Sequence, residues 1–317
     1  MVSDSELDAM LKRLHLANTR RVWRELIVQA EADDWSCRDF LSLLIREEVA
    51  QRQETRLRRC TRQAHFPFLK TIDEFDFRHQ SQVRLALLAS YLSSDFVAEG
   101  RNLILTGPSG RGKTHLAVAI AYRAIQNGFE ALFTSAAAMI DDLSRAFGER
   151  RFREALQPYI KVPVLVVDEV GYLSYGPDAA NVLYHVVNER HLTRRPMVFT
   201  TNKPLGAWGQ VLHDPDLAYA IVDRVLERGR LLSLDGPSFR TRHIDATLLS
   251  DAARILGNAR PKFPEPTARC ENSCSYYRGR SPSAGHSCLA QIVHEAGRAG
   301  PLHSGAVHKL QLAYGRA

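Results

Sequence analysis

Residues 103–120 read Leu103-Ile-Leu-Thr-Gly107-Pro-Ser-Gly-Arg-Gly112-Lys-Thr-His-Leu-Ala-Val-Ala-Ile120. The apolar run at the start predicts a buried strand, and the apolar run at the end predicts a helix. The turn between them has the spacing G-x-x-x-x-G-K-[ST], which is typical of a phosphate-binding loop. A flanking strand and helix are the context that this motif requires. The stretch therefore predicts a site for a nucleoside triphosphate.

The residue types in this turn explain how it would hold phosphate. Glycines allow several backbone N–H groups to approach one anion, and the N-terminus of the following helix adds partial positive charge. Lys113 would reach the β- and γ-phosphates, and the Thr114 hydroxyl would bind Mg²⁺. We therefore expect ATP and Mg²⁺ at a loop made of Gly107, Pro108, Ser109, Gly110, Arg111, Gly112, Lys113, Thr114 and His115.

A second hydrophobic run ends in two acidic residues. Residues 162–167 carry apolar side chains on both faces, as a central parallel strand does, and Asp168 and Glu169 follow them. In open α/β sheets the ligand lies beyond the carboxyl ends of the strands, so this strand would bring both acids beside the loop. We expect Asp168 to hold Mg²⁺ and Glu169 to polarise an attacking water, which predicts ATP hydrolysis.

A further buried strand, within residues 194–202, ends in Asn202. From there the amide would lie beside Glu169 and orient the water or sense the γ-phosphate. The alternative is an Asn that opens an ordinary turn before Pro204. A helix over 218–228 and a strand over 231–234 complete a core that we assign to residues 67–250.

Length and composition narrow the class of protein. The chain has 317 residues, of which 45% are hydrophobic, enough for one sizeable domain and an appended one. No run approaches the ~20 apolar residues of a membrane span, and the first residues are acidic, unlike a signal peptide. Five cysteines without C-x-x-C spacing favour a reducing compartment. We expect a cytoplasmic protein with no membrane partner.

The first 66 residues predict a small all-helical module. Leu7, Met10, Leu11 and Leu14 follow helical spacing, and Ser36 and Asp39 resemble a capping box at the start of a long, arginine-dense helix. Glutamates are interleaved with the arginines, so a solvated charged face is as good a reading as a phosphate-binding one. We expect this module to dock a partner or another copy of the chain.

Residues 251–317 form a tail rich in Pro, Gly and Ser, which predicts disorder. The tail holds nine Lys and Arg against four Asp and Glu, and so carries most of the formal net charge of +7. Net charge is therefore weak evidence for nucleic-acid binding by the folded part.

The order of these signals resembles that of the AAA+ ATPases. Over residues 5–243, the chain resembles more closely the IstB family, the ATP-binding helper proteins of IS21-type insertion sequences, and bacterial DnaC helicase loaders are near relatives. This resemblance implies an αβα P-loop core with a parallel sheet. The segments that carry it are Glu74-Phe75-Asp76-Phe77, Asp168-Glu169-Val-Gly-Tyr172, Thr201-Asn202-Lys203-Pro204-Leu-Gly-Ala-Trp208-Gly209, Asp214-Pro215 and Ile221-Val-Asp223-Arg224.

The resemblance also implies partners. It implies a homo-oligomer on double-stranded DNA that recruits or stimulates the transposase of the same insertion sequence. Arg224 matches an arginine finger offered to a neighbouring copy, the alternative being a helix arginine paired with Asp223. Arg240 matches a second phosphate-sensing arginine. An extra helix within residues 136–160 would contact DNA phosphates, unless its arginines are ordinary surface residues; they are Arg145, Arg150, Arg151 and Arg153.

Three other functions stay open at this point. A DnaC-like helicase loader would share the chemistry and differ in its partner. A small-molecule kinase would use the same loop but need an acceptor pocket and a lid. A non-catalytic, nucleotide-gated scaffold would not need Lys113, Thr114, Asp168 and Glu169 all intact.

Overall fold

The computed structural model describes residues 3–80, 83–172, 175–236 and 238–239. The predicted tail over 251–317 and Arg240 lie outside these residues. Five parallel strands form one sheet in the order β2-β3-β4-β1-β5. The strands are β1 (Asn102–Thr106), β2 (Ala131–Ser135), β3 (Val164–Val170), β4 (Met197–Thr201) and β5 (Gly229–Ser233). The predicted parallel sheet is confirmed, and β5 begins at Gly229, two residues before the strand predicted over 231–234.

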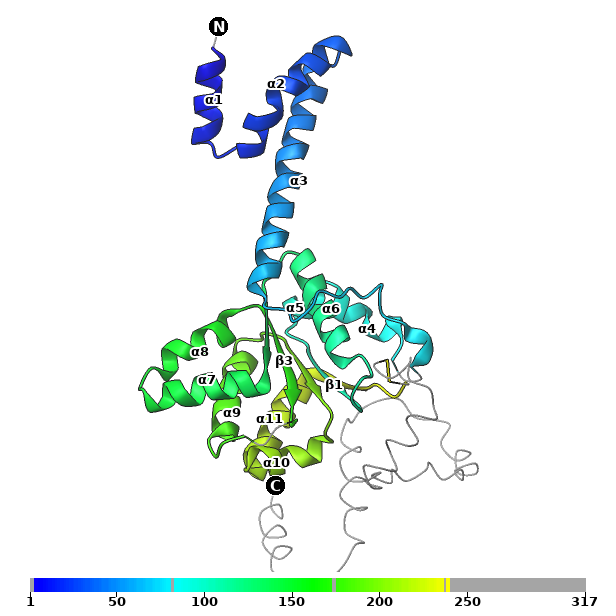
Figure 1. Cartoon of the computed structure of the whole chain (residues 1–317), viewed down its shortest axis with the longest axis vertical. Helices are drawn as coiled ribbons and strands as arrows, with labels where there is room; N and C mark the ends of the chain where they lie inside the picture. Colours follow the sequence, from blue (N-terminus) through cyan, green and yellow to red (C-terminus); the bar gives the residue numbers. More distant parts are fainter. Residues whose placement is uncertain (1–2, 81–82, 173–174, 237, 240–317) are drawn as a thin grey trace, which may run out of the picture. The chain divides into compact units, whose positions relative to one another are not determined.

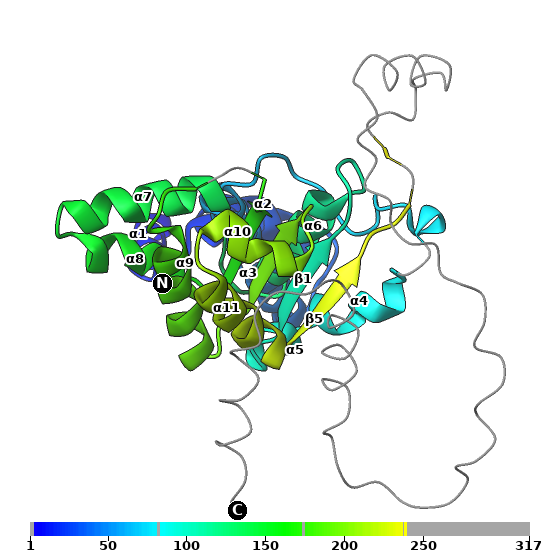
Figure 2. The same ribbon diagram turned by 90° about the horizontal axis from the view of Figure 1, so that it is seen from below.

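Helices cover both faces of the sheet, as Figures 1 and 2 show. Alternate side chains of β3 serve the two faces: Leu165 and Val167 join one apolar cluster, and Val164 and Val166 join the other. The first face is covered by α7 (Ala136–Gly148), α8 (Phe152–Lys161), α9 (Ala179–Leu192), α10 (Trp208–Leu212) and α11 (Pro215–Glu227). The second is covered by α4 (Leu85–Leu92), α5 (Asp95–Ala98) and α6 (Lys113–Gln126). The result is the predicted αβα core.

The N-terminal module consists of α1 (Asp4–Arg13), α2 (Ala17–Ala32) and α3 (Cys37–Gln63). Leu11, Trp23 and Leu44 form its small buried core. The Ser36 hydroxyl accepts a hydrogen bond from Asp39 N and caps α3. Single 3-10 turns elsewhere are η1 (Phe77–His79) and η2 (Leu205–Ala207).

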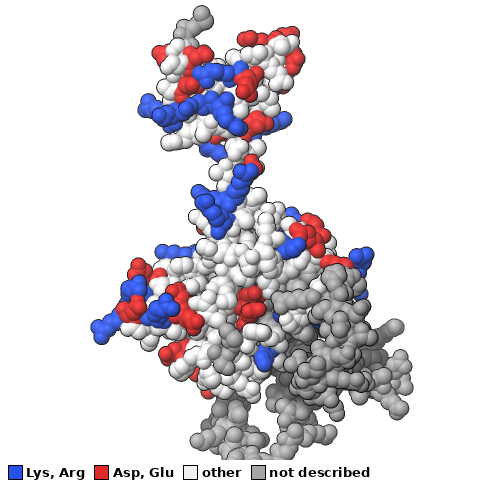
Figure 3. Space-filling view, in the orientation of Figure 1, with Lys and Arg blue, Asp and Glu red and all other residues white. Residues whose placement is uncertain are grey.

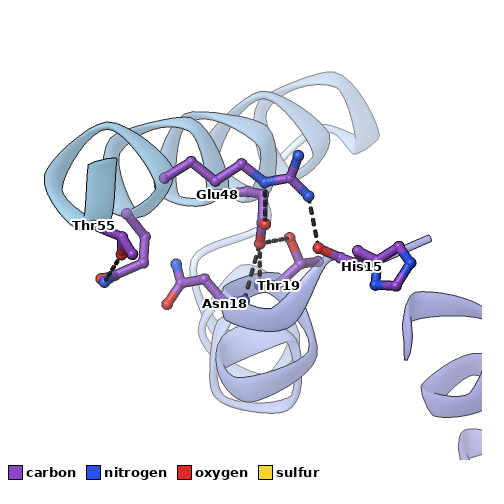
Figure 4. Close-up of polar contacts among 7 residues, drawn as sticks. His15, Asn18, Thr19, Glu48 and Thr55 are labelled. Atoms are coloured by element: carbon purple, nitrogen blue, oxygen red, sulfur yellow. Dashed lines mark hydrogen bonds and ion pairs between the residues drawn. The ribbon is translucent and has the colours of Figure 1, made fainter. Parts of the chain in front are cut away.

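A buried carboxylate joins α2 to α3 (Figure 4). The N-cap residue of α2 is Leu16, whose apolar side chain cannot accept hydrogen bonds from the first N–H groups of the helix. Glu48 of α3 does so instead, accepting from Asn18 N at 3.0 Å and from Thr19 N at 2.9 Å. Arg52 Nε donates to the other Glu48 oxygen at 2.8 Å. Burial alone would raise the pKa of Glu48, but these hydrogen bonds hold it below its ordinary value.

The last turn of α3 packs with the core. Cys60 and Ala64 lie in the same apolar cluster as α6, and the Ala64 carbonyl accepts a hydrogen bond from Phe133 N of β2 at 2.8 Å. Arg56 donates to the Gly128 carbonyl. The same helix therefore contributes to the module at its start and to the core at its end. Across the described ranges, every helix is too short or too polar to cross a membrane.

Candidate active site

A cleft of about 800 Å³ lies at the carboxyl ends of β1, β3 and β4. Its walls combine the predicted loop, the two acids near the end of β3, and residues at and just after the end of β4. A segment before β1, Phe133 of β2 and Phe239 beyond β5 also line the cleft. The lining residues include Phe68, Phe75, Gly112, Lys113, Thr114, His115, Asp168, Glu169, Thr200 and Asn202.

Two glycines of the loop have backbone angles and neighbours that exclude a side chain. Gly107 has φ +139°, and a Cβ there would lie 2.3 Å from the Leu234 carbonyl oxygen. Gly112 has φ +88°, and a Cβ there would lie 2.6 Å from Phe75 Cε2. The loop therefore requires glycine at both positions.

The end of this loop is built to receive an anion. Helix α6 starts at Lys113, and its N-cap residue, Gly112, has no side chain that could cap the first N–H groups. Lys113 Nζ folds back and donates to the carbonyls of Gly107 and Pro108, at 2.8 Å each. The ammonium thus lies over the loop, where a phosphate would take the place of those carbonyls as its partner.

Two residues of the predicted loop turn their side chains elsewhere. Arg111 donates to the Asp235 carbonyl at 2.8 Å, beyond β5. His115 Nε2 lies 2.9 Å from the Thr71 carbonyl oxygen and packs its ring edge-on to Phe75. Their backbone N–H groups belong to the loop, but these side chains tie it to neighbouring segments.

Thr114 and Asp168 meet across the sheet. Thr114 Oγ1 lies 3.1 Å from both carboxylate oxygens of Asp168, which is only 7% exposed. The Thr200 hydroxyl of β4 also donates to Asp168 Oδ1. Hydroxyl and carboxylate oxygens are the ligands that Mg²⁺ prefers, so this pair fits a magnesium ion bound beside a phosphate.

Glu169 leaves the regular strand geometry. Its φ is +61°, a left-handed angle that few residues other than glycine adopt. The residue is exposed and lines the cleft, and its N–H donates to Thr200 Oγ1 at 2.9 Å. Glu169 therefore lines the same cleft as the Thr114–Asp168 pair.

Asn202 lines the same cleft as Glu169. Its Oδ1 is buried and has no hydrogen-bond partner within the described ranges. The β4 residue that bonds both acids is Thr200, which sequence reasoning missed. A signal was available in the sequence, since two polar residues, Thr200 and Thr201, end β4 after three apolar ones.

The segment before β1 was also missed. Phe68 and Phe75 line the cleft. The Phe75 ring packs edge-on to the rings of Phe77 and His115, with distances between ring centres of 4.8 Å and 5.2 Å. Apolar and aromatic walls of this kind suit the face of a nucleobase. Phe75 belongs to the segment 74–77, which the sequence singled out only because it resembles the IstB family. That segment has neither strand nor helix periodicity, so no pattern in the sequence predicted that Phe75 would line a site.

Arg224 lies outside the cleft of its own chain. Its Nε donates to Asn188 Oδ1 at 3.2 Å, and its guanidinium lies 4.8 Å from the centre of the Tyr184 ring. Asn188 and Tyr184 belong to α9, and Arg224 Nη1 also donates to the Ala220 carbonyl at 3.3 Å. Among the described residues, these contacts of Arg224 do not involve Asp223, the partner considered from sequence.

The four arginines considered for DNA are exposed around the turn between α7 and α8. Arg151 pairs with Glu149, and Asp141, Asp142 and Glu154 lie on the same two helices. Figure 3 shows positive and negative side chains interleaved over this hairpin, on the left of the view. The hairpin is therefore charged but not uniformly basic.

The αβα core and the glycine-rich loop at the edge of its parallel sheet define a P-loop nucleotide-binding fold. The chain belongs to the family described as "IstB-like ATP binding protein", whose sequence model matches residues 9–247. It is similar to the "Insertion sequence IS5376 putative ATP-binding protein" of Geobacillus stearothermophilus, with 34% identity over 73% of this chain and 91% of that protein. It is also similar to the "Insertion sequence IS21 putative ATP-binding protein" of Pseudomonas aeruginosa, with 32% identity over 75% of this chain and 89% of that protein.

Solved structures resemble the chain more distantly. A crystal structure of the DnaC helicase loader has a TM-score of 0.42 and 22% identity, covering 47% of this chain and 87% of that one. A crystal structure of DnaI has a TM-score of 0.42 and 24% identity, covering 57% of this chain and 92% of that one.

Proposed function

We propose that this protein is an ATP-dependent helper of DNA transposition, which binds ATP with Mg²⁺, hydrolyses it and acts on DNA as an oligomer. The observation that carries the nucleotide chemistry is the contact of Thr114 with Asp168, with Glu169 in the same cleft. The names of its relatives, ATP-binding proteins of insertion sequences, support the biological context.

In this proposal each residue has one task. Backbone N–H groups of the loop and Lys113 hold the triphosphate, and the aromatic wall around Phe75 holds the base. Thr114 and Asp168 supply oxygens to Mg²⁺, which when bound would neutralise phosphate charge. The Glu169 carboxylate orients a water and accepts its proton, and Asn202 contacts the water or the γ-phosphate.

The partners in the proposal follow from the family. Arg224 of one copy reaches the cleft of the next, so that two copies complete each site. Arg145, Arg150, Arg151 and Arg153 contact DNA phosphates, and the oligomer recruits or stimulates the transposase of the same insertion sequence. The N-terminal module serves as the docking element, residues 67–250 as the ATPase and 251–317 as an appended tail.

Glu169→Gln tests the proposal. The variant should bind ATP like the wild type, lose turnover and stay on duplex DNA with ATP, because the amide cannot accept the proton from water. Glu25→Gln, an exposed change on α2, controls for the loss of a surface charge. ATP titration, phosphate release and gel-filtration with duplex measure the three properties. Normal turnover by Glu169→Gln would remove that residue from its proposed role.

Further assays separate the alternative functions. A helicase loader would bind a replicative helicase and not a transposase in a pull-down with the full chain. A kinase would need a small-molecule acceptor, whereas the proposal expects turnover to rise with protein concentration and duplex. A chain that binds ATP but never releases phosphate under those conditions would be a nucleotide-gated scaffold.

A further inference from the structure

Thr200 lies between the two acids of the cleft and bonds both of them. The side chain is 1% exposed. Its hydroxyl oxygen accepts a hydrogen bond from Glu169 N at 2.9 Å, and its single proton is donated to Asp168 Oδ1. Because a threonine hydroxyl has one proton, the two bonds together define its orientation.

The strand register explains why Thr200 occupies this position. Val167 pairs with Phe199 and Val170 pairs with Thr201, so two residues of β3, Asp168 and Glu169, face one residue of β4. This arrangement is a β-bulge, and Thr200 is the single residue opposite it. Bulges re-aim side chains where a strand meets a site. Here the bulge contains the two acids.

The bulge contains a backbone conformation that needs support. Glu169 has φ +61°, which is unfavourable for a residue with a Cβ and persists only when its surroundings hold it. The Glu169 N–H donates a hydrogen bond to the Thr200 hydroxyl, and the Glu169 carbonyl accepts one from the Tyr175 hydroxyl at 3.3 Å. Burial raises the pKa of Tyr175, which keeps the hydroxyl protonated as a donor.

We propose that Thr200 is the positioning residue for Glu169: its hydroxyl holds the bulge in the form that points the Glu169 carboxylate into the cleft. This proposal rests on the proposed function of Glu169. The neighbouring Thr201 provides a contrast on the same strand. Its hydroxyl bonds the Val170 carbonyl at 2.7 Å and Lys203 N at 3.1 Å, and neither acid.

Thr200→Val removes the hydroxyl at nearly constant volume, and Thr200→Ser restores it. We expect Thr200→Val to lower kcat for ATP at least tenfold with the dissociation constant for ATP changed less than threefold, and Thr200→Ser to recover most of kcat. Thr201→Val should lower kcat less than Thr200→Val. In a Glu169→Gln background, Thr200→Val should add little further loss, because it acts through Glu169.

A crystal structure of nucleotide-free Thr200→Val gives a readout independent of turnover. We expect Glu169 to leave the left-handed region there and to keep it in the wild type and in Thr200→Ser. If Thr200→Val does not fold, Thr200→Ala serves for the same measurements. An unchanged kcat, an equal loss of kcat and ATP binding, or an unchanged Glu169 backbone would each overturn the proposal. Normal turnover by Glu169→Gln would instead remove Glu169 from its proposed role, whatever Thr200 does.

Discussion

Thr114 Oγ1 lies 3.1 Å from both carboxylate oxygens of Asp168, although 54 residues separate the two in the sequence. The contact crosses a strand, because β4 lies between β1 and β3 in the sheet. It brings the start of α6 and the end of β3 to one point at the edge of the sheet, where one divalent cation could bind both residues.

Thr114→Ala should therefore lose the magnesium dependence of ATP binding. In the wild type, we expect removal of Mg²⁺ with EDTA to weaken ATP binding at least tenfold; in Thr114→Ala, EDTA should change it little. Thr114→Ser keeps the hydroxyl and is the matched control. Isothermal titration with and without EDTA measures the effect. Equal magnesium dependence in the wild type and Thr114→Ala would contradict the assignment.

Arg224→Ala should lower turnover by about 10³-fold, the size of effect seen when a trans arginine is removed from other NTPases. ATP binding to the isolated chain should change little, since Arg224 contacts Asn188 and Tyr184 in its own chain. Mixing this variant with Glu169→Gln provides the sharper measurement. Arg224→Ala would supply the intact cleft, and Glu169→Gln would supply the arginine from the neighbouring copy. The mixture should therefore regain ATPase activity that neither variant has alone. Wild-type turnover by Arg224→Ala at every concentration would exclude the shared site.

Arg150→Ala and Arg153→Ala should weaken binding to duplex DNA of any sequence. Each should also reduce the slope of log K against log salt by about 1, as expected for one lost phosphate contact. Arg230→Ala removes the same charge from β5, at the opposite edge of the sheet from β2, and is the control. Fluorescence anisotropy at several salt concentrations gives the slopes. Slopes equal to that of Arg230→Ala would leave the hairpin without a role in DNA binding.

Glu48→Gln should destabilise the protein at pH 7 by about 2 kcal/mol, the scale for hydrogen bonds to a buried charge. Because the folded-state pKa of Glu48 is lowered, its contribution is present above the ordinary value of 4.5 and is lost as pH falls through the folded value. The difference between wild type and variant should thus shrink below pH 4.5. Circular dichroism melting from pH 7 to 3 measures it, with exposed Glu47→Gln as control. A pH-independent difference would contradict this account.

Arg190→Lys should lower the melting temperature by ~6–12 °C, which corresponds to about 3 kcal/mol. Arg190 is fully buried and donates to four backbone carbonyls, those of Tyr159, Val162, Pro163 and Pro196. Burial lowers its pKa, and these carbonyls compensate the charge. A lysine cannot reach all four, so buried carbonyls would be left unpaired. Arg194→Lys, at an exposed neighbour, should melt like the wild type in differential scanning calorimetry.

The sequence was sufficient where the signal is local. The loop motif requires a strand before it and a helix after it, and β1 and α6 have those positions. The apolar run before Asp168 predicted a central strand, and β3 lies inside the sheet. The roles assigned to Glu169, Asn202 and Arg224 are not tested by the fold and stay predictions.

Sequence alone determined the class of core and the loop at its centre, because glycine spacing and apolar runs act on adjacent residues. Only the tertiary structure decided that Thr200 faces Asp168 and Glu169, that Phe75 covers Gly112, and that α3 caps α2 through Glu48. These contacts depend on strand order and register and on helix packing. They join residues that are far apart in the chain, and no spacing rule connects them.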